Sequence, residues 1–153
     1  MKHMSLQEIT AACRGTWHGD PEDLSRQVSN VVIDSRKAGK DSLFIAIKGA
    51  RVDGHSFIPQ VMKEGALCSI SEQDLGEVEY PYIQVSSCEQ ALKDIAEHYR
   101  RSLDIKVVGI SGSVGKTSTK EMIASVLAEK YSVLKTEGNF NNEIGLPLTV
   151  FNI

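Results

Sequence analysis

A glycine-rich turn between an apolar run and a helix-like run constrains this chain more than any other feature. Residues 107–110 form the apolar run. Glycines then recur at intervals of three, at positions 109, 112 and 115, and a Lys-Thr pair opens the next segment. Glycines let the backbone curl until its N–H groups converge on an anion, and a following helix adds the positive end of its dipole. The order predicts a strand, a phosphate-binding turn and a helix, which together indicate an α/β fold.

In such a loop each residue type has a chemical role. The candidate nucleotide-binding residues are Gly112, Ser113, Val114, Gly115, Lys116, Thr117 and Ser118. Lys116, the candidate catalytic residue, would reach the terminal phosphates of a nucleotide, and the Thr117 hydroxyl would be a ligand of Mg²⁺. The predicted ligand is therefore a nucleoside triphosphate.

The match to the usual phosphate-loop pattern is incomplete, because Ile110 stands where that pattern has its first glycine. One alternative is a glycine-rich turn with a chance lysine. A dinucleotide-binding fingerprint is a weaker alternative, since it does not require Lys-Thr at the start of the helix.

Bulk properties exclude several classes of protein. The 153 residues are 41% hydrophobic and 24% charged, with a formal net charge of −3, which is ordinary for a globular chain. There is no basic excess to favour nucleic acid. No apolar run approaches the roughly 20 residues needed to cross a bilayer, and the N-terminus lacks an apolar secretion core. We therefore expect no membrane insertion and a cytoplasmic protein.

Cysteines and histidines give no metal or disulfide pattern. The three cysteines are odd in number and widely spaced: Cys13, Cys68 and Cys88. Cys68 lies in an apolar run and is interpreted as a small buried hydrophobe. The four histidines are interpreted as solvent-facing or locally bonded: His3, His18, His55 and His98.

Periodicity and capping motifs divide the chain into two regions. Capping boxes begin at Ser5 and Ser87, and each predicts a helix. A third helix is expected from residue 57 to a stop at Gly65. Strands are predicted at residues 28–33, 42–47, 66–70 and 82–85. A polar hinge near residues 100–104 then separates a small mixed-sheet domain, residues 1–103, from the start of a nucleotide-binding domain, residues 104–153.

The second region is predicted to contain a strand, the phosphate loop, a helix and a returning strand at residues 131–134. A turn-rich loop covers residues 136–147, and Pro147 stands where a helix could begin. Because an open nucleotide-binding sheet needs several more strands to cover both faces, the chain is interpreted as a fragment.

Five segments, taken in order along the chain, resemble the Mur ligase family. Residues 34–36, 42–49 and 53–55 resemble the family's amino-terminal domain, and residues 109–119 resemble its ATP loop, with Ser113-Val114 where an Asn often precedes the glycine. Residues 138–147 are similar to the branch of the family that adds D-alanyl-D-alanine.

The resemblance implies a three-domain enzyme that uses ATP and Mg²⁺ to join D-alanyl-D-alanine to a UDP-N-acetylmuramoyl-tripeptide through an acyl phosphate, in peptidoglycan synthesis. It implies that Ile33, Ser35 and the loop around Arg51 contact the uridine nucleotide, and that Asn141 and Asn142 contact substrate. The family's metal-binding glutamate, modified lysine, catalytic histidine and third domain have no counterpart in residues 1–153. We therefore expect these residues alone to be inactive, and the enzyme to be a monomer.

Other interpretations stay open. Ser35 could simply end a strand, and the two asparagines could serve turn chemistry alone. The chain could be a non-catalytic module that binds a UDP-sugar and a nucleotide. A small kinase or ATPase unrelated to the cell wall is disfavoured, because no candidate Walker-type aspartate follows the phosphate loop.

Overall fold

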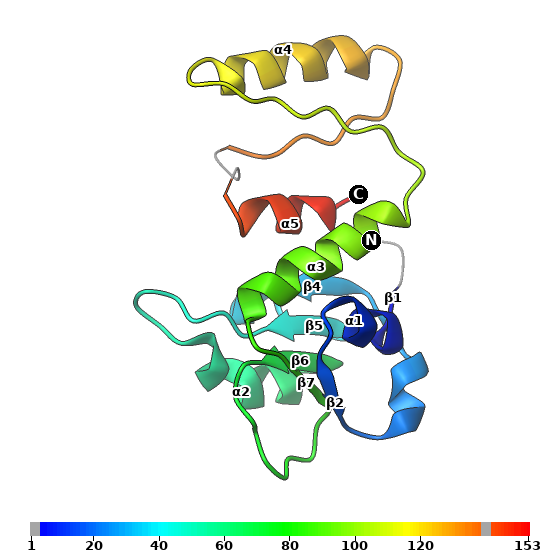
Figure 1. Cartoon of the computed structure of the whole chain (residues 1–153), viewed down its shortest axis with the longest axis vertical. Coiled ribbons are helices and arrows are strands. Elements are labelled where there is room, and N and C mark those ends of the chain that lie inside the picture. The colour runs from blue at the N-terminus through cyan, green and yellow to red at the C-terminus, as the bar shows by residue number, and fades with distance from the viewer. Residues whose placement is uncertain (1–3, 139–141) are drawn as a thin grey trace.

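The structure, a computed structural model, describes residues 4–138 and 142–153. Its centre is a five-stranded sheet in the order β2-β7-β6-β5-β4 (Figure 1). Four strands are parallel: β4 (Asn30–Val32), β5 (Ser42–Ile45), β6 (Cys68–Ser71) and β7 (Tyr82–Gln84). The edge strand β2 (Thr16–His18) is antiparallel to β7. The mixed sheet and its flanking helices confirm the predicted α/β class.

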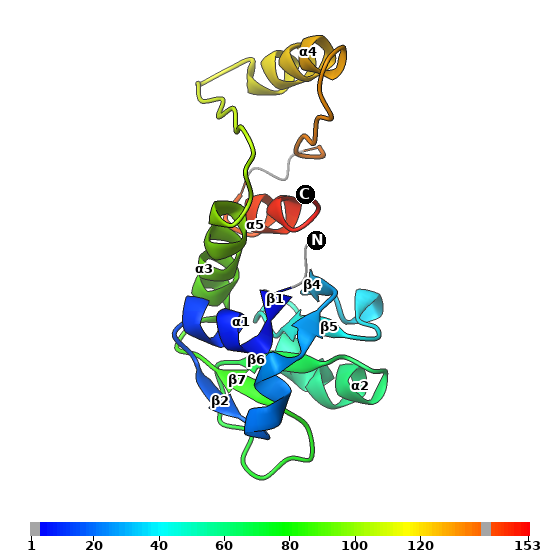
Figure 2. The same ribbon diagram turned by 90° about the vertical axis from the view of Figure 1, so that its right-hand side faces the viewer.

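Helices cover both faces of this sheet. The helices α1 (Leu6–Ala12) and α3 (Cys88–Arg101) pack on one face, and α2 (Ile58–Lys63) packs on the other (Figure 2). Strand side chains alternate accordingly: Leu43 of β5 belongs to the cluster with α1 and α3, whereas Phe44 belongs to the cluster with α2. Both are fully buried, so the sheet is the middle layer of the first region.

The two predicted helix starts are confirmed. Ser5 and Glu8 form a reciprocal capping box, in which Glu8 N–H donates to Ser5 Oγ at 3.2 Å and Ser5 N–H donates to Glu8 Oε2 at 2.8 Å. Ser87 caps α3 by accepting from the Gln90 N–H at 3.2 Å. The buried residues of α3 then recur at helical spacing: Cys88, Ala91, Leu92, Ile95, Ala96 and Tyr99.

One predicted strand is divided in two. The expected strand at 28–33 appears as β3 (Gln27–Val28), which pairs with β1 (Met4–Ser5), and as β4, which pairs with β5. Ser29 lies at the change of partner, where its N–H donates to the Asp41 carbonyl at 2.9 Å. The edge strand β2 and the short β1 were not predicted, because two or three residues carry too little periodicity.

The second region extends away from the sheet. From α3 the chain runs to α4 (Lys116–Ala128) and returns to α5 (Gly145–Val150), which packs against α3 (Figure 1). Two apolar side chains of α4 are largely exposed, Met122 at 71% and Val126 at 72%. The predicted helix after the phosphate loop is confirmed, but its apolar face is only partly covered by the described residues.

The two strands predicted around α4 are wrong in this structure. Neither the run before the phosphate loop nor residues 131–134 are assigned to a sheet, and Val107 and Val108 are more than half exposed. A strand needs a neighbour to pair its backbone groups, and no described strand lies beside either segment. Within the described ranges, no helix is long and apolar enough to cross a membrane.

The prediction that Cys68 is a buried hydrophobic residue is confirmed, because its side chain is fully buried. The three thiols are free and buried, and no disulfide is formed between them. Burial raises the pKa of the Cys88 thiol to about 12 and raises that of Cys68 further. They are inert core residues.

Candidate phosphate loop and sheet-edge site

The predicted phosphate loop forms a turn that leads directly into α4. Gly115 stands at the N-cap position with φ 79° and ψ 0°, a left-handed conformation that favours glycine. No side chain caps this helix, so the N–H groups of its first turn have no intrahelical acceptor. The turn therefore presents several free backbone donors at one point.

All seven candidate nucleotide-binding residues lie together in this turn and the first turn of α4. The Lys116 ammonium folds back over the loop and donates to the Gly112 carbonyl at 2.6 Å. Val114 is 89% exposed, and Ser113, Thr117 and Ser118 are also exposed. The first turn of α4 carries no acidic side chain, so its potential is positive and attracts an anion.

The loop also fits a magnesium ion shared with phosphates. No described residue bonds the Thr117 hydroxyl, which stays free to ligate a cation at the start of α4. Among the described residues, no cluster of three or more His, Cys, Asp or Glu could hold a metal alone. Since Mg²⁺ commonly takes one or two protein ligands and completes its shell with phosphates and water, a single hydroxyl suits such a site.

Two residues that the sequence did not reveal hold α4 to the returning segment. Lys120 Nζ donates to the Thr136 carbonyl at 2.6 Å, and Glu121 forms an ion pair with Lys135. The Lys135 ammonium, with a smaller effect of Lys120, holds the pKa of Glu121 below its ordinary value. Because these partners lie 14 to 16 residues apart in the sequence, their spacing does not predict that they interact. The phosphate loop is nevertheless braced through the first two turns of its helix.

The candidate uridine contacts lie at another place, the carboxyl edge of the parallel sheet. Strands β4 and β5 are parallel neighbours, so the segments that follow them leave the sheet side by side. Ile33 packs half-buried against the core, while no described residue bonds the Ser35 hydroxyl. The structure thus leaves the Ser35 side chain available at this edge, whereas the Ile33 side chain serves packing.

Asp34 organises the turn that carries Ser35. Its carboxylate accepts from the Arg36 backbone N–H at 3.1 Å and from the Arg36 guanidinium at 2.9 and 2.7 Å. These bonds lower the pKa of Asp34 to about 2. Arg36 is thereby oriented beside Ser35, although its side chain remains 86% exposed. A fixed, exposed guanidinium can pair with a phosphate.

After β5, residues 48–53 form a projecting arm that carries Arg51 (Figure 1). Lys48 and Asp53 pair as an isolated antiparallel bridge, and Gly49 N–H donates to the Val52 carbonyl at 2.9 Å. Arg51 is exposed in this arm. Both Ser35 and Arg51 therefore follow adjacent parallel strands at the same edge.

His55 closes the base of the arm. Its side chain is 5% exposed, its Nδ1 lies 2.6 Å from Asp53 Oδ1, and its Nε2 accepts from the Glu72 N–H at 3.0 Å. The bond to Asp53 is local, as predicted for the histidines, but the burial and the bond to Glu72, the residue after β6, were not predicted. His98 is exposed, and the His18 ring stacks on Tyr82 with ring centres 4.4 Å apart.

Asn142 serves turn chemistry in this structure. Its Oδ1 accepts from the backbone N–H groups of Gly145 at 2.6 Å and Ile144 at 3.3 Å, which supports the start of α5. The helix begins two residues before Pro147. No described residue bonds the Asn142 side-chain NH₂ group. Asn141, like His3, lies outside the described residues.

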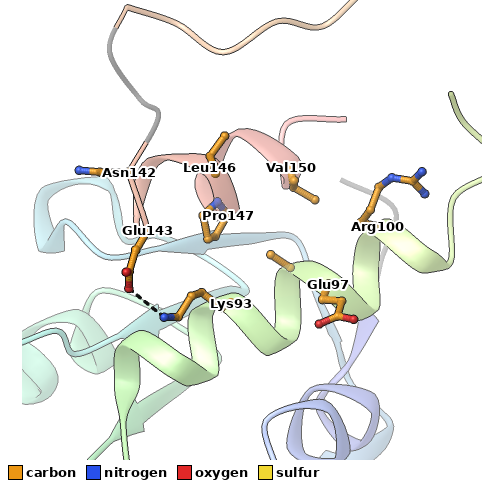
Figure 3. A pocket seen from close by; sticks show the side chains of 9 residues that line it. Lys93, Glu97, Arg100, Asn142, Glu143, Leu146, Pro147 and Val150 are labelled. Atoms are coloured by element: carbon orange, nitrogen blue, oxygen red, sulfur yellow. Dashed lines mark hydrogen bonds and ion pairs between the residues drawn. The ribbon is translucent and has the colours of Figure 1, made fainter. Parts of the chain in front are cut away.

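A groove of about 540 Å³ separates α3 from the segment that ends in α5 (Figure 3). Its lining residues are Lys93, Ala96, Glu97, Arg100, Asn142, Glu143, Leu146, Pro147 and Val150. Lys93 Nζ and Glu143 Oε2 form an ion pair of 2.9 Å across one end, which lowers the pKa of Glu143. Asn142 is thus tied through its neighbour to the first region.

Comparison with known proteins matches both regions to one family. A family model described as "Mur ligase family, catalytic domain" matches residues 27–100, and one described as "Mur ligase middle domain" matches residues 110–153. The chain belongs to the Mur ligase family. The resemblance found in the sequence motifs is confirmed.

Individual relatives agree with this assignment. The chain is 38% identical over 148 residues to the UDP-N-acetylmuramoyl-tripeptide–D-alanyl-D-alanine ligase of Bacillus subtilis (strain 168), a match covering 95% of the chain and 32% of that relative. A crystal structure of MurF from Acinetobacter baumannii aligns with a TM-score of 0.89 at 32% identity, over 100% of this chain and 33% of that one.

A third relative carries a nucleotide. The structure of MurF ligase from Thermotoga maritima in complex with ADP aligns with a TM-score of 0.74 at 37% identity, over 80% of this chain and 28% of that chain. In all three comparisons the chain spans about a third of the length of its relative.

Proposed function

We propose that the full-length protein containing this chain is an ATP-dependent ligase of peptidoglycan synthesis. It joins D-alanyl-D-alanine to a UDP-N-acetylmuramoyl-tripeptide, as the names of the matched relatives state for those proteins. The observation that carries the proposal is the phosphate loop, with left-handed Gly115 before an uncapped α4 and Lys116 folded over it. The ADP in the Thermotoga maritima structure supports ATP as the nucleotide.

We assign the binding of the two nucleotides to different domains. We assign residues 1–103 to the UDP-sugar, through Ser35, Arg51 and the backbone near Ile33, and residues 104–153 to the beginning of the central ATP-binding domain. Asn142 would contact substrate through its side-chain NH₂ group, which α5 does not use. We assign the same role to Asn141, its neighbour in the sequence. We assign the enzyme to the cytoplasm, because its UDP-linked substrate is water-soluble. We expect it to be a monomer.

The reaction proceeds in two steps. The carboxylate at the end of the tripeptide attacks the γ-phosphorus of ATP, giving an acyl phosphate and ADP. The amine of D-alanyl-D-alanine then attacks the acyl carbon, the amide forms, and phosphate leaves. Both steps depend on positioning and on neutralising phosphate charge rather than on covalent catalysis by the protein.

The residues of this chain serve the first step. The N–H groups of the loop bind the phosphate oxygens, and the Lys116 ammonium leaves the Gly112 carbonyl to neutralise charge on the terminal phosphates. Thr117 would hold Mg²⁺, which would supply further charge neutralisation at the phosphates when bound. The groups that bind D-alanyl-D-alanine and activate its amine belong to the two-thirds of the relatives' length that this chain does not match.

Phosphate release by the full-length protein tests this function. We expect release only when ATP, UDP-N-acetylmuramoyl-tripeptide and D-alanyl-D-alanine are all present, and none from residues 1–153 alone. Release that is independent of D-alanyl-D-alanine would contradict ligase activity. Calorimetric binding of the UDP-sugar without any turnover of the full-length protein would instead favour the non-catalytic binding module.

A further inference from the structure

The base of the arm is held by a partly buried hydrogen-bond network, centred on the buried His55 ring, that the ligase chemistry does not use. The His55 ring lies between Asp53, at the end of the arm, and the backbone of Glu72, directly after β6. The Glu72 carboxylate continues the network by accepting from the Cys88 N–H, at the first residue of α3, at 2.8 Å. The network therefore joins the base of the arm to the segment after β6 and, through the Glu72 carboxylate, to the start of α3.

The geometry determines which ring nitrogen of His55 carries the proton. The Glu72 backbone N–H can only donate, so His55 Nε2 must be the acceptor. The proton is then on Nδ1, which donates to the Asp53 carboxylate. Both nitrogens are used. The His55 backbone N–H, and after it the ring bond, lowers the pKa of Asp53. The neutral Nδ1–H ring is therefore the form that joins the arm to Glu72, directly after β6.

The arm has few other attachments to the sheet. Gly54 N–H donates to the Ile47 carbonyl at 3.0 Å, closing the two ends of the arm on each other. Beyond its base, Val52 is 52% exposed and Arg51 is exposed. The His55–Glu72 bond is a side-chain link from the base of the arm to the segment that directly follows β6.

We propose that His55 is a positioning residue that holds the arm, residues 48–53, in its nucleotide-binding orientation. The inference rests on the proposed function in so far as Arg51 binds the uridine nucleotide. His55 is too buried to touch that ligand, and it acts by linking Asp53 to Glu72. Its loss would weaken binding of the UDP-linked substrate and leave ATP binding and chemistry unchanged.

Two substitutions separate the halves of this link. In His55→Asn the shorter amide can still donate to Asp53, but it does not reach the Glu72 N–H. In His55→Gln the longer amide oxygen can accept from the Glu72 N–H in place of Nε2. The proposal predicts that Gln substitutes for His and that Asn does not, whereas a general packing role predicts similar behaviour of both variants.

Steady-state kinetics of the full-length ligase give the first measurement. We expect His55→Asn to raise the KM for UDP-N-acetylmuramoyl-tripeptide by about five- to tenfold, as for the loss of a roughly 1 kcal/mol hydrogen bond. Its kcat and its KM for ATP should stay within about twofold, and His55→Gln should stay close to the unsubstituted protein. An unchanged KM for the UDP-substrate in a folded His55→Asn variant would overturn the proposal.

Limited trypsin digestion gives a measurement that does not require activity. Cleavage after Arg51 should be faster in His55→Asn than in His55→Gln, and UDP should slow it in the Gln variant more than in the Asn variant. Equal rates of cleavage after Arg51 in the two variants would overturn the proposal that His55 holds the arm. If the kinetic assay shows no turnover at all, the ligase function fails, and the digestion still decides whether His55 holds the arm.

Nitrogen NMR of the unsubstituted full-length protein covers the case in which His55→Asn does not fold. The proposal requires the His55 signals of a neutral ring with its proton on Nδ1. Signals of a ring protonated on Nε2 would overturn it, because that nitrogen could not accept from Glu72.

Discussion

At the scale of single residues, Gly54 and Gly115 are constrained by different physical causes. A Cβ added to Gly54 would lie 2.6 Å from the Ile47 carbonyl oxygen and 2.9 Å from the Ile47 nitrogen, so a close approach of backbones excludes a side chain there. A Cβ at Gly115 would meet nothing within 4 Å, and the constraint is its left-handed φ of 79°. The first glycine shapes the arm, and the second shapes the phosphate loop.

Gly54→Ala should therefore destabilise the first region. We expect a loss of about 1–3 kcal/mol, as for other substitutions that force backbone to move. Gly39→Ala is a matched control, because Gly39 has nothing within 4 Å and an ordinary φ. Thermal unfolding of both variants checks the prediction. Equal melting temperatures of the Gly54→Ala and Gly39→Ala variants would show that the backbone at Gly54 can move to admit a side chain at little cost.

At the scale of elements, α1 depends on the capping box at its start. Ser5→Ala removes the oxygen that accepts from Glu8 N–H and the hydroxyl that donates to the Glu8 carboxylate at 2.8 Å. We expect a loss of about 1 kcal/mol near neutral pH. Denaturant unfolding measures this, with Ser25→Ala as a control, since the Ser25 hydroxyl bonds only a carbonyl in an exposed turn.

The capping contribution should also depend on pH. The bonds from Ser5 lower the pKa of Glu8 in the folded protein, so the stability they add is fully present above the ordinary glutamate pKa. It is lost as the pH falls through the lowered pKa, because the protonated carboxyl accepts these bonds poorly. The stability difference between Ser5→Ala and the unsubstituted protein should shrink over that acidic range. A difference that stays constant with pH would contradict this account of the box.

The docking of α5 on α3 is attributed to apolar contact rather than to the ion pair. Phe151 is 5% exposed, and its ring centre lies 6.0 Å from that of Tyr99, whose hydroxyl donates to the Ile153 carbonyl at 2.9 Å. Phe151→Ala should cost about 3 kcal/mol or more locally and speed amide exchange in α5. Glu143→Gln, which removes the exposed pair with Lys93, should change exchange little. Equal effects of the two substitutions would refute this ranking.

The sequence predicted those elements whose signals are local. Capping boxes at Ser5 and Ser87, together with helical spacing, were enough to predict the starts of α1 and α3, and the apolar run after Ser42 was enough to predict β5. The strands expected beside the phosphate loop did not form, because pairing depends on neighbours that no local pattern describes. Pairs such as Lys93 with Glu143, and the His55–Glu72 bond, join residues far apart in the chain and could not be predicted from spacing.

At the scale of the whole molecule, the two candidate sites lie on different parts of the chain. The sheet-edge site with Ser35 and Arg51 belongs to the three-layered first region, and the phosphate loop lies at the start of α4, which extends away from that region (Figure 1). The segment with Asn142 and α5 returns to α3 and so connects the two. The glycine and lysine pattern predicted phosphate binding by the loop, whereas the relation between the two sites required the fold.

We propose that Lys116 and its loop bind the triphosphate of ATP, and that the ligase binds its UDP-substrate at a different place. Calorimetry of the full-length protein with ATP tests this most directly, with Lys116→Met as the variant and Lys63→Met, an exposed lysine at the end of α2, as its control. We predict that Lys116→Met lowers ATP affinity by about tenfold or more, as for loss of a charged hydrogen bond, and leaves UDP-substrate affinity unchanged. Unchanged ATP affinity in Lys116→Met would contradict the account.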